Sequence, residues 1–282
     1  MEQVWVIDAG GSSCDWWLCT RDAVRQIAKT GGYNPNYNVA GEFLAELVEV
    51  SGLSSLHEAQ QVYWYGAGCS SEKNQEAVRR ILLQLAPRAF IEVKSDLWGA
   101  ARACYVGEPL LCAILGTGSN ACFFDGDSLR TQKPSLGFVL GDEGSGNHIG
   151  REILKAYFHG NMPEELRESL RTFSDMNLNT VVERIYRSNQ PAAYLASFAP
   201  FAAQYQAHPF MRTLLNSIFD AFIEQYLLTF PESKHCAVSW VGSVAYHFQD
   251  IISESLKEHQ LRCGIFVREP AERLARFHQP ED

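Results

Sequence analysis

Residues 4–20 read VWVIDAGGSSCDWWLCT: an apolar run, a carboxylate, a short turn of glycine and serine, and a second apolar run. Short apolar runs bounded by glycine, serine and aspartate are typical of β-strands, and so short a turn joins two strands as a hairpin. A third run follows the turn at Arg21 and Asp22. The pattern predicts three successive strands, over residues 4–7, 15–20 and 24–29.

The same order of features recurs in the second half of the chain. Residues 110–124 read LLCAILGTGSNACFF, and a shift of 107 positions places Ile7 on Ile114 and Gly11 on Gly118. A strand, a glycine turn and a second strand thus occupy corresponding places in both halves. Repetition of one unit indicates a duplicated fold, so we expect an α/β protein with two lobes around a cleft.

Apolar residues at helical or strand spacing fill the rest of the chain. We expect an N-terminal lobe over residues 1–106 and a C-terminal lobe over 107–282. The second lobe carries a helical insertion at about 160–230, whose apolar residues form either a dimer face or part of the core. The last helix, 269–277, is a candidate to pack back on the N-terminal lobe. The other helices are expected at 40–50, 72–85, 97–103, 147–158, 163–171, 178–188, 192–206, 210–229 and 244–259, and the other strands at 62–65, 90–93, 110–115, 120–124, 128–132, 235–241 and 262–267.

Composition narrows the class of protein. Of 282 residues, 46% are hydrophobic and 20% charged, which is an ordinary globular balance. The formal charge is 24 minus 33, or −9, and no run of lysine and arginine is present, so a nucleic-acid partner is disfavoured. No apolar run approaches the roughly 18 residues that cross a bilayer, and the chain starts directly on a strand, so we expect no membrane association and a cytoplasmic protein.

The eight cysteines indicate neither disulfides nor a metal site. No two of them have C-x-x-C spacing, and several lie within apolar strand-like runs, as Cys112 and Cys122 do. We expect reduced thiols buried in a cytosolic protein. Zinc and iron–sulfur sites have no support from the spacing.

The first glycine turn has the composition of a phosphate-binding turn. Asp8 ends a strand, and Gly10, Gly11 and Ser12 follow it. Glycine lets backbone N–H groups approach a phosphate closely. A plain hairpin turn is the alternative, and taken alone it is the commoner one. The spacing matches neither the Rossmann fingerprint nor a Walker A motif.

The second glycine turn, at residues 116–120, has a similar composition to the first. Thr117, Gly118, Ser119 and Asn120 crowd short hydrogen-bonding groups into one turn. These residues are also ordinary choices for a β-turn. Two such turns, one in each lobe, could hold a phosphate chain from both sides.

Asp96 follows the expected strand 90–93 and precedes a helix. In an open α/β sheet, a carboxylate at the carboxyl end of a strand faces the ligand crevice. There it could accept the proton of a hydroxyl group during phosphoryl transfer. The alternative is that Ser95 or Asp96 caps the helix, and the two roles are compatible.

Three further segments have the composition of a ligand site. Residues 137–146 contain four glycines and two adjacent acids, of which Asp142 suits sugar hydroxyls and Glu143 suits a helix cap. Residues 31–38 form a polar loop in which Asn34 and two tyrosines could meet a sugar ring, or simply face solvent. Gly242 and Ser243 end a strand and begin a helix, either beneath a nucleoside or as an ordinary capped turn.

Five motifs, taken in order, resemble the N-acetylglucosamine kinases. This group is also described as the BadF/BadG/BcrA/BcrD ATPase family, within the actin/hexokinase/Hsp70 superfamily. The agreement in order and spacing extends over essentially the full length. The motifs are Asp-x-Gly-Gly-Ser at 8–12, Ser-Asp at 95–96, Gly-Thr-Gly-Ser-Asn at 116–120, Gly-Asp-Glu-Gly-Ser at 141–145 and Val-Gly-Ser at 241–243.

The resemblance implies a duplicated ribonuclease H-like fold and an ATP-dependent kinase that phosphorylates the 6-hydroxyl of an amino sugar. It makes Asp96 the base. Asp8 and the turn at Gly10–Ser12 would hold phosphates and, through water, Mg²⁺. Lobe closure would exclude water from the transfer.

The remaining roles also come from the resemblance. Thr117, Gly118 and Ser119 would bind phosphates, and Gly242 and Ser243 the adenosine. The sugar would meet Asn34, Asn120 and Asp142. The chain departs from the family at Pro35 and at residues 137–140, and N-acetylglucosamine, N-acetylmuramate and glucosamine all remain as acceptors.

Two rival functions fit the same fold. One is the ATPase activator of a 2-hydroxyacyl-CoA dehydratase, which holds an iron–sulfur cluster between subunits, with Cys104 and Cys122 as the candidate ligands. The other is a sugar sensor without catalysis, which the presence of Asp96 and both glycine turns disfavours.

Overall fold

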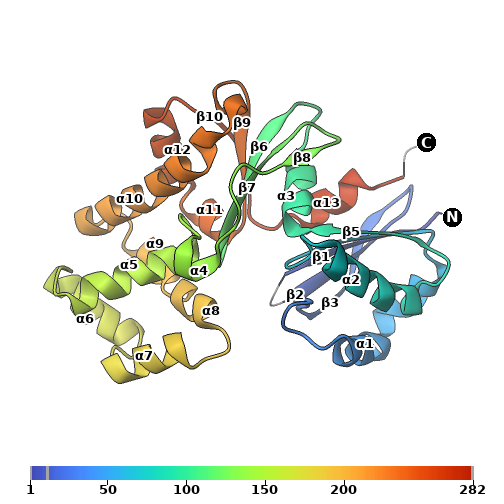
Figure 1. Cartoon of the computed structure of the whole chain (residues 1–282), viewed down its shortest axis with the longest axis horizontal. Helices are drawn as coiled ribbons and strands as arrows, with labels where there is room; N and C mark the ends of the chain where they lie inside the picture. Colours follow the sequence, from blue (N-terminus) through green and yellow to red (C-terminus); the bar gives the residue numbers. More distant parts are fainter. Residues whose placement is uncertain (1, 11–12, 281–282) are drawn as a thin grey trace. The chain divides into compact units, whose positions relative to one another are not determined.

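The structure, a computed structural model, describes residues 2–10 and 13–280. Contacts divide the chain into two compact units (Figure 1). Unit 1 contains the residues up to Gly107 together with those from Glu269 onward, and unit 2 contains Glu108–Arg268. The C-terminal segment, counted with the second lobe in the sequence-based division, therefore belongs to unit 1, as its apolar contacts below explain.

Unit 1 is built on a five-stranded sheet in the order β3-β2-β1-β4-β5. The first three strands form an antiparallel meander, and the next two run parallel to β1. Parallel strands need a crossover connection, which helices supply here. The strands are β1 Val4–Ala9, β2 Ser13–Cys19, β3 Val24–Gly31, β4 Gln61–Gly66 and β5 Phe90–Ser95.

Helices cover both faces of this sheet, so that β1 is buried along nearly its whole length. On one face, Trp5 and Ile7 join a cluster that includes residues of α1 and α2. On the other face, Val4 and Val6 pack with Leu274 of the C-terminal helix. The helices are α1 Ala40–Glu49, α2 Glu72–Leu85, α3 Asp96–Cys104 and α13 Ala271–Phe277, with a 3₁₀ helix at Ser51–Glu58.

Unit 2 repeats this sheet with the order β10-β9-β6-β7-β8. Again three antiparallel strands are followed by two parallel ones, so each strand of unit 1 has a counterpart in unit 2. The duplicated α/β fold expected from the two glycine turns is confirmed. The strands are β6 Leu110–Leu115, β7 Ser119–Phe124, β8 Leu129–Arg130, β9 Ala237–Val241 and β10 Arg262–Val267.

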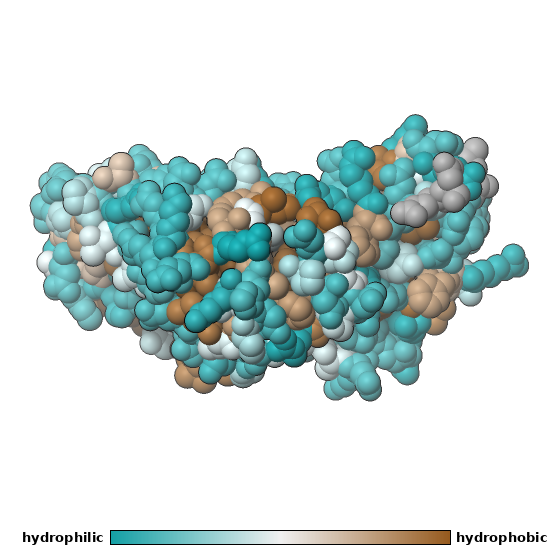
Figure 2. Space-filling view, turned by 90° about the horizontal axis from the view of Figure 1, so that it is seen from above, coloured by the Kyte–Doolittle hydropathy of each residue, from teal (hydrophilic) through white to brown (hydrophobic). Residues whose placement is uncertain are grey.

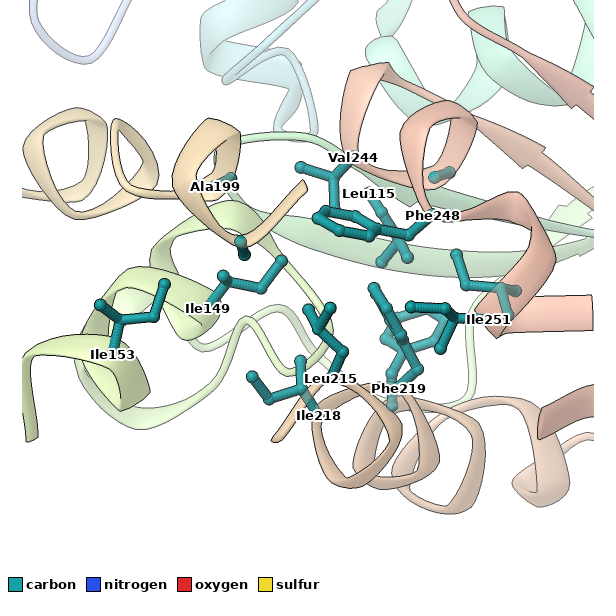
Figure 3. Close-up of a cluster of buried hydrophobic side chains, with 14 of the residues drawn as sticks. Leu115, Ile149, Ile153, Ala199, Leu215, Ile218, Phe219, Val244, Phe248 and Ile251 are labelled. Atoms are coloured by element: carbon teal, nitrogen blue, oxygen red, sulfur yellow. The ribbon is translucent and has the colours of Figure 1, made fainter. Parts of the chain in front are cut away.

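A large apolar core joins the helices of unit 2 to its sheet. Figure 3 shows Ile149 of α5 and Phe219 of α10 pointing into the same cluster as Leu115 and Val244. The face of the molecule in Figure 2 is mainly hydrophilic, with smaller apolar areas between polar side chains. The helices are α4 Gly137–Leu140, α5 Gly146–Phe158, α6 Glu164–Phe173, α7 Leu178–Tyr186, α8 Pro191–Ala196, α9 Ala199–Gln204, α10 Pro209–Gln225, α11 Ser243–His247 and α12 Gln249–Glu258, with 3₁₀ turns at Leu227–Thr229 and Pro231–Lys234.

Three of the expected helices are each divided. Residues 192–206 form α8 and α9, because Pro200 lacks the N–H that would continue one helix. Residues 210–229 form α10 followed by a 3₁₀ turn, and residues 244–259 form α11 and α12 with a break at Phe248. Helical spacing of apolar residues does not reveal such short breaks.

Most of the cysteines lie in the interior of the protein. Six of the eight cysteines are buried, Cys236 is half-buried and Cys263 is exposed. In the described part of the chain, no helix combines the length and apolar character that crossing a bilayer requires.

Candidate active site

In unit 2, the glycine turn between β6 and β7 is tied to the start of α5 by backbone bonds. The N–H of Gly146 donates to Gly116 O at 2.8 Å, and the N–H of Asn147 donates to Thr117 O at 3.1 Å. Ser145 caps the helix by accepting from the N–H of His148. The turn is therefore fixed on one side while Thr117 remains exposed.

Asp142 lies against this turn in a strained conformation. Its φ is +59°, a left-handed value uncommon for residues other than glycine, and its side chain is buried. Asp142 Oδ1 accepts from the N–H of Ser119 at 3.3 Å, and Oδ2 accepts from the side-chain amide of Asn147 at 2.8 Å. A Cβ on Gly118 would lie only 3.1 Å from both carboxylate oxygens, so glycine allows this close approach.

The charge state of Asp142 reflects two opposing effects. Burial raises the pKa of the carboxyl group above its usual value, while the bonds from Asn147 and Ser119 lower it. These donors favour the carboxylate, which can then accept hydrogen bonds from hydroxyl groups.

Gly242 brings a second loop up to the same turn. Its φ is +111°, and a Cβ there would lie 2.4 Å from Leu115 O. Only glycine fits, because both the conformation and the contact exclude a side chain. Ser243, the next residue, begins α11.

A cavity of about 470 Å³ lies beside Thr117 and Ser243. Its floor includes Val244 and Phe248, which Figure 3 shows near Ala199. Most of the wall comes from small or apolar residues of α8 and α9. A volume of this size, with a glycine turn at its rim, suits a nucleoside joined to phosphates. The lining residues are Gly116, Thr117, Ala193, Ala196, Ser197, Ala199, Pro200, Ala203, Ser243, Val244, His247 and Phe248.

Two glycines of α5 let α8 form that wall. A Cβ on Gly146 would lie 3.0 Å from Ala196 Cβ, and a Cβ on Gly150 only 1.9 Å from Leu195 O. The Gly-x-x-x-Gly spacing in a helix places both on one side, because residues four apart share a face. The Gly-x-x-x-Gly spacing is visible in the sequence, but only the structure shows that its purpose is the close contact with α8.

In unit 1, Asp8 lies near the end of β1, directly opposite Asp15 of β2. Lys29 of β3, opposite Asp15 in turn, forms an ion pair with it at 3.2 Å. Burial, followed by the charges of Asp15 and Asp96, raises the pKa of Asp8 to about 7. Gly10 N–H donates to Ser13 O at 2.9 Å. Gly11 and Ser12, both expected at the phosphate site, lie outside the described residues.

Asp96 is the first residue of α3, directly after β5. Ser95 occupies the cap position but makes no capping bond with its side chain; instead Asp96 Oδ1 accepts from the N–H of Leu97 at 2.9 Å. The side chain is accessible to solvent, yet the protein atoms around it desolvate the charge and raise the pKa of the carboxyl group to about 6. Asp96 thus combines a partial capping role with the pKa of a base for neutral pH.

Asn34 lies in a turn packed on the Gly66–Gly68 segment. Its Oδ1 accepts from the N–H of Asn36, and a Cβ on Gly68 would lie 2.3 Å from that oxygen. Asn74 of α2 holds the turn from below, donating to Asn36 Oδ1 and to Gly68 O. The loop that composition alone left as surface or site is therefore an ordered turn.

Asn120, in β7, is half-buried, and its Oδ1 accepts from the N–H of Ala121 at 2.9 Å. Unit 2 thus brings Gly118 and Ser119 into direct contact with Asp142. Thr117 and Ser243 line the cavity, and Gly242 lies against Leu115 O. Unit 1 places Asp8 near the carboxyl end of β1 and Asp96 just after the carboxyl end of β5, with β4 between these two strands.

Sequence reasoning missed Asn147 and Asp15. Asn147 was read only as the start of a helix, although asparagine is uncommon inside helices and therefore worth examining. Asp15 follows the glycine turn by three positions, and its pairing with Asp8 depends on the register of the hairpin.

Comparison with known proteins finds sugar kinases that share this fold. A solved candidate N-acetylglucosamine kinase from Porphyromonas gingivalis is 30% identical over 99% of this chain and 98% of its own, with a TM-score of 0.89. A glucosamine kinase from Vibrio cholerae is 23% identical over 84% of this chain and 74% of its own. A ROK family glucokinase from Streptomyces griseus, solved with glucose and AMPPNP, shares the fold at 15% identity, covering 97% of this chain and 98% of its own, with a TM-score of 0.55. No family model matches the chain.

Proposed function

Because this chain belongs to the N-acetylglucosamine kinase family and is an ATP-dependent amino sugar kinase, we propose that it transfers the γ-phosphoryl group of ATP to a sugar 6-hydroxyl. The proposed acceptor is N-acetylglucosamine or a close relative such as N-acetylmuramate. The observation that carries this proposal is the position and pKa of Asp96. This residue follows a parallel strand, and the pKa of its carboxyl group is raised to about 6.

Asp96 is the proposed base. With a pKa of about 6, most of the group is ionised at pH 7, yet it is basic enough to accept a proton as the hydroxyl oxygen attacks phosphorus. The bond from Leu97 N–H holds one carboxylate oxygen, which leaves the other to orient the hydroxyl group.

Unit 2 supplies the proposed nucleotide site. The cavity beside Thr117 and Ser243 would take the adenosine, and the turn at Thr117, Gly118 and Ser119 would meet the phosphates through the N–H groups of Thr117 and Gly118. Gly242 contributes through its close approach to Leu115 O, which seats α11 against the turn.

Asp8 is the proposed contact for Mg²⁺, through water. The residues present fit such a cation, because Asp8 and Asp15 are opposite each other on adjacent strands, and burial followed by the charge of Asp15 raises the pKa of Asp8. Mg²⁺ in kinases is commonly held by one or two carboxylates, waters and substrate phosphates. When bound, it would neutralise phosphate charge and favour the ionised form of Asp8; the chain's own part is to hold Asp8 near the end of β1.

For the sugar, the proposed contacts are Asn34 from unit 1 and Asn120 and Asp142 from unit 2. Asp142 is held by two donors, as a carboxylate that binds hydroxyl groups in fixed directions should be.

An ADP-release assay across a panel of sugars tests the proposal. The panel contains N-acetylglucosamine, N-acetylmuramate, glucosamine and glucose, with 6-deoxy-N-acetylglucosamine as the control that lacks the attacked oxygen. Sugar-dependent ADP release with an N-acetylated sugar, and none with the 6-deoxy analogue, is the expected result. If no sugar raises ADP release above the rate with ATP alone, the proposal fails.

A further inference from the structure

The side chain of Asn147 joins two parts of unit 2 to which different ligands are assigned above. Asn147 is the second residue of α5, and its side chain is fully buried. The same amide nitrogen donates to Asp142 Oδ2 at 2.8 Å and to Thr117 O at 2.7 Å. One amide group therefore holds both the carboxylate assigned to the sugar and the turn assigned to phosphate.

The fold alone does not account for this side chain. Backbone bonds from Gly146 and Asn147 already tie α5 to the turn. The amide oxygen of Asn147 is buried without a hydrogen-bond partner among the described residues, and an unmet buried polar atom costs about 1–3 kcal/mol. An apolar residue would pack there without that cost. The amide is therefore explained by its two hydrogen bonds, to Thr117 O and to Asp142 Oδ2.

Asp142 depends on the turn for its orientation. Its Oδ1 is fixed by the N–H of Ser119, which belongs to the turn, and its Oδ2 by Asn147, which also bonds to the turn. A shift of the turn on binding phosphate would therefore move both donors of the carboxylate. Linkage is reciprocal, so a sugar that fixes Asp142 must also favour the position of the glycine turn that binds phosphate.

We propose that Asn147 is a positioning residue that couples Asp142 to the turn at Thr117, so that sugar and nucleotide each strengthen binding of the other. The inference rests on the proposed function, since it uses the roles assigned there to Asp142 and Thr117.

The variant Asn147→Leu tests it, because leucine has the same branched shape, with four side-chain heavy atoms, and no amide. We would measure the Kd of ADP by calorimetry with and without saturating sugar, and then KM and kcat. In the wild-type enzyme, sugar should lower the Kd of ADP by about fivefold or more, which is the usual lower range of coupling between sites. In Asn147→Leu this factor should fall below about two, and the KM for sugar should rise by roughly tenfold, with a smaller change in kcat.

A double-mutant cycle separates this role from a structural one. If Asn147 acts through Asp142, Asn147→Leu should change the KM for sugar by less than about twofold in an Asp142→Asn background. The matched control is Asn177→Ala, which removes an N-cap from α7 and so lowers stability without touching the turn. Asn177→Ala should leave the coupling factor unchanged. Asn147→Ala repeats the measurement if the leucine variant does not fold.

Two results would overturn the inference while the proposed function stands. One is an active wild-type enzyme in which sugar leaves the Kd of ADP unchanged. The other is an Asn147 variant that keeps the wild-type coupling factor. A wild-type enzyme that phosphorylates no sugar would overturn the proposed function itself and the inference with it, so the two failures are told apart by the wild-type assay.

Discussion

Asp96 combines two effects that act against each other on one carboxyl group. The start of α3 and the N–H of Leu97 favour the ionised form, while desolvation disfavours it more strongly. The balance leaves a group that is mostly ionised at neutral pH and still able to take up a proton.

Replacement of Asp96 by Asn should remove the base while keeping the shape of the side chain. We expect kcat to fall by about 10²–10⁴-fold, the usual contribution of a positioned base. The affinity for sugar and for ADP, measured by calorimetry, should change by less than about threefold. Asp22→Asn, at an exposed turn, is the control and should keep full activity. Turnover close to wild type in Asp96→Asn would place the base elsewhere, with Asp142 as the next residue to replace.

The pH profile should report the same carboxyl group. Because the pKa of Asp96 is raised from 3.8 to about 6, the group gains a proton as the pH falls through 6 and then cannot act as a base. At excess Mg²⁺, which keeps Asp8 ionised, kcat should fall about tenfold for each unit of pH below 6. A profile that stays flat down to pH 4.5 would contradict this assignment.

Among the loops and helices, the contact of Gly242 with the end of β6 leaves no room for a side chain. Gly242→Ala would put a methyl group 2.4 Å from Leu115 O, at a φ of +111°. We expect a loss of stability of about 1–3 kcal/mol and a KM for ATP raised by roughly tenfold or more, measured by thermal unfolding and steady-state kinetics.

Gly160→Ala is the matched control for that variant. Gly160 also has a positive φ, of +73°, but its Cβ would meet only the end of Arg167 at 3.6 Å. It should lose stability through backbone strain and keep the KM for ATP. Equal effects of the two variants on that KM would argue against a role for the Gly242 contact in the nucleotide site.

The strands and most helices could be predicted because their apolar spacing is local information. The repeat of 107 residues correctly indicated two sheets of one design. The breaks at Phe198 and Phe248 were missed, because one or two residues outside a helix hardly disturb that spacing. Asn147 and Asp15 were missed for a different reason: each matters through a partner brought near by tertiary structure or strand register. The left-handed conformation of Asp142 has only a weak signal in residue type, because aspartate adopts it more often than most residues but still uncommonly.

In unit 1 as a whole, α13 is held to the sheet by a network around His278. His278 stacks on Tyr63, and its Nε2 lies 2.6 Å from the hydroxyl oxygen of Tyr65. Arg102 donates to that same oxygen and forms an ion pair with Glu92. The Tyr65 hydroxyl is therefore left to donate to His278, which must be unprotonated to accept. Burial, and then the charge of Arg102, lower the pKa of His278 to about 3.

This network should make unit 1 sensitive to acid. Because the folded pKa of His278 lies below its unfolded value of about 6.5, its stabilising effect is complete above pH 6.5 and is lost as the pH falls towards 3. We expect His278→Gln, which cannot be protonated, to show a weaker loss of Tm between pH 6.5 and 4 than the wild type. His57→Gln, at an exposed site, should follow the wild type. Parallel curves for all three proteins would contradict the assignment.

The return of α13 to the first sheet also affects how the protein is made. Val4, Val6 and Tyr65 are synthesised before unit 2, but the helix that covers them, with Leu274 and Ala275, is synthesised only after unit 2. Unit 2 is continuous in sequence and can complete its core before unit 1 does. Until α13 is synthesised, the sheet of unit 1 therefore has one uncovered apolar face, which chaperones can bind. A premature stop codon just after residue 268 would damage the first lobe to be translated while sparing the second.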